Sequence, residues 1–151
     1  MFLPKEDHVS RHVPYSKLLR DDDDNPVGIL PQAFEMREKI DEKALSVNWL
    51  EYFGNNHEDN IVKTIQSFRL SRDGKIGNFS AFGIGNVGIL EDTCAEHRHT
   101  KVRVLYDKKK VSRNNKSHAR IIRLPINDRV IMQSLASNVF TKLVANKSIP
   151  E

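Results

Sequence analysis

The order in which helical and extended patterns follow one another most constrains the fold of this chain. Apolar residues recur at helical spacing after Asp59 and again after Asp128, whereas most of the segment between has the composition of strands. Strands that alternate regularly with helices favour a parallel sheet, and that alternation is missing here. The sequence therefore predicts an α+β fold with residues 1–151 as one domain. A small, mostly antiparallel sheet is expected to pack against about three helices, one of them a C-terminal amphipathic helix.

Two helices are predicted before the strand-rich part of the chain. In the first, residues 45–54, Ser46 is the expected N-cap and Gly54 the expected C-cap. The second is expected to begin near Asp59 and to end before residue 73, where an Asp-Gly pair breaks the pattern.

A final helix is predicted to begin at Asp128 and to continue through Leu143, because its apolar positions keep helical spacing. Extended segments are predicted where β-branched, aromatic or glycine-rich apolar runs lie between turn residues, at residues 28–36, 78–90, 101–106 and 118–124.

Composition limits the location and the membrane contacts of the protein. No run of apolar residues approaches the roughly 18 that a membrane-spanning helix needs. The first fourteen residues mix charged with apolar side chains, so a secretory signal is not expected. Cys94 is the only cysteine, which rules out an intrachain disulfide and fits a reducing cytosol. We therefore expect a cytoplasmic protein that does not contact membranes.

The net charge of +4 is distributed unevenly along the chain. Residues 21–60 hold eleven acidic and three basic side chains, a balance of −8, whereas residues 101–123 hold nine basic side chains and one acidic one, a balance of +8. The two segments could neutralise each other within the fold, across a homodimer or against a protein partner. Alternatively, the basic segment meets the phosphates of RNA or DNA.

A nucleic-acid contact would use the cations of the basic segment. Such contacts give an affinity that is non-specific and falls with salt. Tyr106 is the only aromatic residue nearby, so the sequence lacks the alternating aromatics of a single-strand stacking platform. The residues assigned to this role are Lys108, Lys109, Lys110, Arg113, Lys116 and Arg120.

Catalytic candidates come from opposite ends of the chain. His118 lies at the expected start of a strand and among cations, which lower the pKa of an imidazole and leave it neutral to act as a base. Arg11 could stabilise an oxyanion or phosphorane beside it, with His12 as a second imidazole. More than a hundred residues separate Arg11 from His118, so the sequence does not determine whether they are neighbours.

Two further motifs suggest ligands without establishing them. Gly83, Gly85 and Gly88 match GxGxxG, but the surrounding segments lack the pattern of a dinucleotide-binding βαβ unit, so glycines of a strand or hairpin are the favoured interpretation. Cys94, His97 and His99 offer zinc-binding atoms within six residues, and a fourth ligand would have to come from a distant histidine such as His57 or His118. We assign no metal site and no cofactor from sequence.

Several short stretches together resemble a group of small, uncharacterised bacterial proteins. They are residues 10–14 (SRHVP), 32–34 (QAF), 45–47 (LSV), 87–89 (VGI) leading to Cys94, and 117–121 (SHARI). The basic loop here is richer in charge than the group's pattern, and the final helix lies outside it. The resemblance implies a bacterial, cytoplasmic, single-domain protein and draws attention to Arg11, Ser46 and His118, but it implies no reaction.

Three functions follow as hypotheses. The first is a bacterial protein that binds or acts on nucleic acid, as a component of a toxin or defence operon would. The second is a non-enzymatic subunit that holds a protein partner or a second copy of itself. The third is an enzyme directed at a small molecule or nucleotide through a pocket formed by Arg11, Ser46 and His118, which predicts a concave site with those side chains facing inward.

Overall fold

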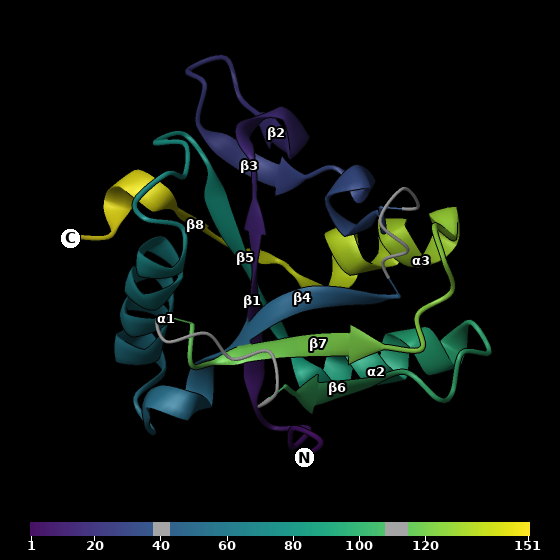
Figure 1. Ribbon diagram of the computed structural model, residues 1–151. Helices are drawn as coiled ribbons and strands as arrows, with labels where there is room; N and C mark the ends of the chain where they lie inside the picture. Colours follow the sequence, from purple (N-terminus) through teal and green to yellow (C-terminus); the bar gives the residue numbers. More distant parts are fainter. Residues whose placement is uncertain (38–42, 108–114) are drawn as a thin grey trace.

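The protein folds around one antiparallel sheet of six strands, with a separate two-stranded ribbon beside it (Figure 1). The computed structural model describes residues 1–37, 43–107 and 115–151. The helices are α1 (His57–Ser71), α2 (Val87–Glu96) and α3 (Arg129–Ser134). The strands are β1 (His8–Val13), β2 (Leu18–Arg20), β3 (Pro26–Ile29), β4 (Ala44–Trp49), β5 (Ala81–Asn86), β6 (Arg103–Tyr106), β7 (His118–Ile122) and β8 (Lys142–Ala145).

Strand β1 lies near the middle of the large sheet, whose order is β6-β7-β4-β1-β5-β8. It pairs with β5 along its whole length, from His8 opposite Asn86 to Val13 opposite Ala81. Its pairing with β4 is short: Val9 faces Trp49, Ser10 faces Asn48, and beyond this point the two strands separate. The separation opens the sheet beside Arg11, which becomes important for the site.

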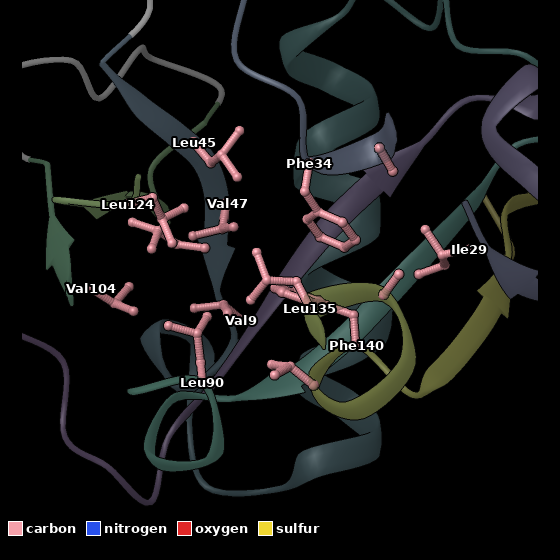
Figure 2. Close-up of a cluster of buried hydrophobic side chains, with 14 of the residues drawn as sticks. Val9, Ile29, Phe34, Leu45, Val47, Leu90, Val104, Leu124, Leu135 and Phe140 are labelled. Atoms are coloured by element: carbon pink, nitrogen blue, oxygen red, sulfur yellow. The ribbon is translucent and has the colours of Figure 1, made fainter. Parts of the chain in front are cut away.

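One face of the sheet is buried in the main hydrophobic core (Figure 2). Val9 from β1 and the alternate residues Leu45 and Val47 from β4 point into it, where they meet α2 and the segment that contains α3. A π-helical turn, Leu135–Val139, continues α3 and places Phe140 against Phe34 with ring centroids 5.1 Å apart. The period-two alternation of these strands is what makes one face apolar.

The opposite face is covered in part by α1. Ile61 and Ile65 of α1 pack over Phe82 and Ile84 of β5 in a second, smaller core. Figure 1 shows α1 to one side of β1, away from α2 and α3. The strands on the other side of β1 present alternate polar side chains to this face. None of the helices in the described part of the chain is long and apolar enough to cross a membrane.

The predicted class is confirmed, since the protein is a single α+β domain with a mostly antiparallel sheet. The strands predicted at residues 101–106 and 118–124 are observed as β6 and β7. Helix α1 was also predicted, although its N-cap is Asn56, whose side chain accepts a hydrogen bond from the Asp59 amide. Asp128 caps α3 as predicted.

Other predicted elements are wrong. Residues 45–54 form β4 and a 3-10 turn instead of a helix, because Ser46 lies inside the strand and is not a cap. The last helix does not continue through Leu143, which lies on β8. Residues 28–36 contain only the end of β3, followed by the 3-10 turn Pro31–Phe34. Strand β1 was missed, since its polar alternate positions obscure an extended pattern.

The first two glycines of the GxGxxG motif belong to a strand, as predicted, and they allow close packing against it. Gly83 and Gly85 lie within β5 on the core face, where Phe140 packs directly onto the strand. A Cβ at Gly85 would lie 3.1 Å from Val139 Cγ1 and 3.2 Å from Phe140 Cδ1. Gly88 lies in the first turn of α2, and a Cβ there would lie 2.9 Å from the Lys5 carbonyl oxygen. Of the extended segment predicted at residues 78–90, residues 81–86 are confirmed as the strand β5, whereas residues 87–90 begin α2, which was not predicted.

This packing predicts the cost of a side chain at Gly85. Gly85→Val should lower the free energy of unfolding by about 1–3 kcal/mol, because the added methyl groups overlap Val139 and Phe140. Gly77→Val is the matched control, because a Cβ at Gly77 meets no atom within 4 Å. Urea denaturation of both variants tests this. Equal stabilities of the two variants would contradict the tight packing of Phe140 on β5.

Candidate functional site

A polar cleft of about 1110 Å³ lies on the face of the sheet that α1 covers only in part. Its floor is formed by Ser10, Arg11 and His12 of β1 and by alternate residues of β4 and β7, and one wall by the last turns of α1. The segments that precede β2, β4 and β7 complete the lining. The residues that line it are Ser10, Arg11, His12, Lys17, Glu35, Arg37, Lys43, Ala44, Ser46, Asn48, Phe68, Ser71, Arg72, Asn115, His118, Arg120 and Ile122.

The lining is strongly cationic. Six of its side chains are Lys or Arg, and Glu35 is its one carboxylate among the described residues. Arg120 pairs with Asp107, with 3.3 Å between Nε and Oδ2. Lys17 and Arg72 form no ion pair with any carboxylate in the described ranges. A concave surface with an excess of charges of one sign concentrates the field, so the described lining favours anions.

Arg11 lies at the point where β1 and β4 separate, and its guanidinium binds the backbone on both sides of the gap. Its Nη1 donates to the Ser46 carbonyl oxygen at 2.8 Å, and its Nε and Nη2 donate to the Ala33 carbonyl oxygen at 3.1 and 2.9 Å. The guanidinium therefore occupies the gap in the sheet and takes the place of missing strand-to-strand hydrogen bonds. It fixes the backbone of Ser46, so Arg11 is a positioning residue for that side chain.

Ser46 and His118 meet on the floor of the cleft. His118 Nε2 lies 3.2 Å from Ser46 Oγ, which is hydrogen-bonding distance. The pair is set by the register of β4 against β7, in which Ser46 faces Arg120 and Asn48 faces His118, so that Ser46 and His118 are diagonal neighbours on one face. Two chemistry-bearing side chains thus converge from residues 72 positions apart in sequence.

Asp107 lies behind His118. Its carboxylate is 5% exposed, and Oδ2 lies 3.8 Å from His118 Nδ1. At this distance the carboxylate and the imidazole make an electrostatic contact, and Arg120 Nε lies closer to the same oxygen, at 3.3 Å. Backbone pairing maintains this arrangement, since the Asp107 amide donates to the His118 carbonyl oxygen at 3.2 Å. The order of groups is therefore Asp107, His118 and Ser46, from the interior outward.

Asn48 fixes the chain that leads into His118. Its Nδ2 donates to Asn115 Oδ1 and, at 2.9 Å, to Ser117 Oγ. The Trp49 amide donates to the Ser117 carbonyl oxygen at 2.8 Å. Strand β7 therefore starts at a defined position next to β4, and the imidazole of His118 is held where it can reach Ser46.

His12 lines the same cleft but packs against aromatic rings. Its ring centroid lies 5.1 Å from the centroids of both Phe68 and Phe82. Burial, followed by the nearby Arg72 and Arg11 guanidinium groups, lowers the pKa of His12 from 6.5 to about 4. The imidazole is therefore neutral at pH 7, and its position between β1 and α1 joins the floor of the cleft to its wall.

The cleft brings together all four predicted catalytic residues, Arg11, His12, Ser46 and His118. Of the residues predicted to bind nucleic acid, Arg120 lines the cleft, and the Lys116 carbonyl oxygen accepts a hydrogen bond from the Tyr106 hydroxyl at 2.8 Å. Lys108, Lys109, Lys110 and Arg113 lie outside the described residues.

The Cys94, His97 and His99 motif does not form a ligand set in the described part of the chain. Cys94 is completely buried in the main core, and burial together with nearby Glu91 raises the pKa of its thiol to about 11. His97 Nε2 lies 3.4 Å from Ser134 Oγ. Cys94 is therefore a small core residue.

The sequence did not assign Asp107 to this site, and it did not single out Lys17 or Arg72. The available signal for Asp107 was its position as the one acidic residue of the basic segment 101–123, directly after the strand at 103–106. A single carboxylate retained among nine cations could have been recognised as a partner for one of them.

Comparisons with protein-family models, with curated proteins and with solved structures found no match to this chain.

The pKa of His12 predicts a pH-dependent stability. Between pH 6.5 and about pH 4 the unfolded state binds a proton that the folded state does not, so the contribution of neutral His12 is complete above pH 6.5 and is lost as the pH falls. Between pH 7 and pH 4.5 this costs about 2–3 kcal/mol of unfolding free energy. Between pH 7 and pH 4.5, His12→Phe should lose about 2–3 kcal/mol less unfolding free energy than the wild type. Urea denaturation of both proteins at both pH values measures this difference. An equal loss of unfolding free energy in the two proteins would contradict the lowered pKa of His12.

Proposed function

We propose that this protein is an enzyme that binds a phosphate ester of the nucleotide type in the cationic cleft and acts on it with Ser46 and His118. One observation above all supports this: a serine and a histidine at hydrogen-bonding distance lie on the floor of a cleft lined by six Lys or Arg side chains. This is the third hypothesis from sequence, which required Arg11, Ser46 and His118 to face one concave site.

The charge and size of the cleft support a phosphate-bearing ligand. Lys17 and Arg72 lack carboxylate partners among the described residues, so their charges are available to an anion. Hydrogen bonds between charged donors and phosphate oxygens are about twice as strong as neutral ones. A volume of about 1110 Å³ accommodates a molecule the size of a nucleotide.

The Asp107, His118 and Ser46 arrangement supports a group transfer. Ser46 Oγ attacks phosphorus while His118 Nε2 accepts the hydroxyl proton, and the bond from phosphorus to the leaving oxygen, in line on the far side, breaks as that oxygen takes a proton from solvent. Water then attacks the phosphoserine from that far side and gives one proton to solvent, while His118 returns its proton to Ser46 Oγ, which releases phosphate and restores the serine. Asp107 stabilises the imidazolium that exists between the two steps.

The other two hypotheses make different predictions for the same experiment. A nucleic-acid protein would bind an RNA or DNA strand more tightly than a free nucleotide, through several phosphates. An interaction subunit would bind neither, and Ser46 and His118 would then have no chemical role. Binding of ADP and of a labelled RNA oligonucleotide, each at two salt concentrations, distinguishes the three.

Removal of two cleft cations tests the ligand class. Lys17→Gln/Arg72→Gln should weaken ADP binding by about a hundredfold or more, since each charged hydrogen bond contributes about 1.5–3 kcal/mol. Lys101→Gln/Arg129→Gln is the control: it removes the same charge from exposed positions outside the cleft, and should change the affinity by less than about threefold. Isothermal titration calorimetry measures both.

Absence of ADP binding at low salt, or equal weakening in both double variants, would contradict the proposal. Equal weakening would show that only the net charge attracts the nucleotide.

Removal of the reacting groups tests the chemistry. Ser46→Ala and His118→Gln should each lower phosphate release from a nucleotide by at least about a hundredfold, while ADP affinity stays within about threefold. Ser71→Ala is the matched control, because Ser71 lines the same cleft but its hydroxyl donates to the Phe68 carbonyl oxygen at 2.6 Å. Full activity in Ser46→Ala would overturn the role of Ser46 as nucleophile.

A further inference from the structure

Three metal-ligating side chains meet at the start of α1, outside the cleft. His8 comes from the first position of β1, Glu51 from the 3-10 turn Leu50–Phe53, and His57 from the first position of α1. One ligand atom from each of the three lies within 4.8 Å of the others, and none of the three lines the cleft. The sequence pattern suggests His57 only as a distant ligand for the Cys94 motif and does not point to His8 or Glu51.

Two members of this cluster are held in place by hydrogen bonds. Glu51 Oε2 lies 2.9 Å from His8 Nδ1, and Glu51 Oε1 accepts a hydrogen bond from the His8 amide at 2.7 Å. The carboxylate is therefore oriented before any ligand arrives. Fixed orientation of a ligating carboxylate strengthens metal binding.

The ion pair between His8 and Glu51 does not account for the position of the third member, His57. Its ring centroid lies 4.5 Å from that of His8, so the imidazoles are stacked edge to face. His57 Nδ1 is buried and has no hydrogen-bond partner in the described part of the chain. A buried polar atom without a partner costs free energy, so such an atom beside a histidine and a carboxylate calls for a ligand.

We propose that His8, Glu51 and His57 form a binding site for a divalent transition metal, with Zn²⁺ as the preferred ion. Two imidazole nitrogens and one carboxylate oxygen are a donor set typical of zinc. Tetrahedral bonds of about 2.0–2.1 Å place ligand atoms roughly 3.4 Å apart, so side-chain rotation closes the present separations. The side chains of His8 and Glu51 are 30% and 22% exposed, which leaves the fourth position to water.

The electrostatic surroundings allow a cation at this position. Lys142 is the nearby cation from β8, and it pairs with Glu58 at 2.8 Å on the exposed side of α1. Its charge is therefore compensated outside the cluster. Glu51 supplies a negative charge within the cluster itself, where the ion would lie.

A metal at this site would join three elements that are separate in sequence. It would tie the start of β1 and the Leu50–Phe53 turn to the N-terminal end of α1, the helix whose other end forms a wall of the cleft. We therefore assign the metal a structural effect on the position of α1. Binding should raise the melting temperature of the protein.

Titration of the full chain with Zn²⁺ tests the site. Calorimetry should give one equivalent of Zn²⁺ in the wild type, with affinity lowered by more than about tenfold in His57→Gln and in Glu51→Gln. Co²⁺ in place of Zn²⁺ should give the visible absorption of a tetrahedral site, lost in the same variants. His97→Gln is the matched control, because His97 is exposed and lies outside the cluster. The Zn²⁺ affinity of this variant should be unchanged.

Absence of stoichiometric Zn²⁺ binding to the wild type would overturn the proposal. So would Zn²⁺ binding that His57→Gln leaves unchanged, or that His97→Gln abolishes, since the ion would then be held elsewhere. If Glu51→Gln fails to fold, His57→Gln decides, because it replaces only the first residue of α1. These outcomes do not depend on nucleotide binding, so the experiment tests the metal site separately from the function proposed for the cleft.

Discussion

The incomplete cover that α1 gives to one face of the sheet is the constraint on which the rest of this structure depends. A helix is about 10 Å across, and strands lie about 4.8 Å apart, so one helix covers roughly two strands of a sheet. Helix α1 packs over β5 and its neighbours, where Phe82 and Ile84 provide an apolar surface. The remaining strands on that face present polar side chains, and the cleft lies above them.

Arg11 connects this architecture to the chemistry of the cleft. Where β1 and β4 separate, the backbone carbonyl groups of Ala33 and Ser46 accept hydrogen bonds from its guanidinium. The same interaction that completes the sheet also sets the position of the Ser46 side chain. Arg11 therefore contributes both to the stability of the sheet and to the geometry of the site, and replacing it would disturb both.

Predictions from sequence succeeded where local pattern and packing agree. Helix α1 follows helical spacing of apolar residues, and β7 alternates between the core and the cleft, so both were recognised. The segment of β4 was taken for a helix because Ser46 resembles an N-cap and Gly54 a C-cap, although its alternation of buried Leu45 and Val47 is that of a strand. The four catalytic candidates of the cleft were named from sequence, but its cations Lys17 and Arg72 were not. Asp107 was not assigned to the site because its role depends on the pairing of β6 with β7.

The sequence by itself determined the α+β class, the apolar face of the strands and the types of side chain available for chemistry, because these follow from patterns spanning a few residues. Only the tertiary structure decided that Arg11, Ser46 and His118 share one cleft, and that His8, Glu51 and His57 meet at the start of α1. The physical reason is that strand order and register are set by hydrogen bonding and packing between distant segments. No local pattern encodes which strand lies beside β1, whereas the packed sheet allows one arrangement.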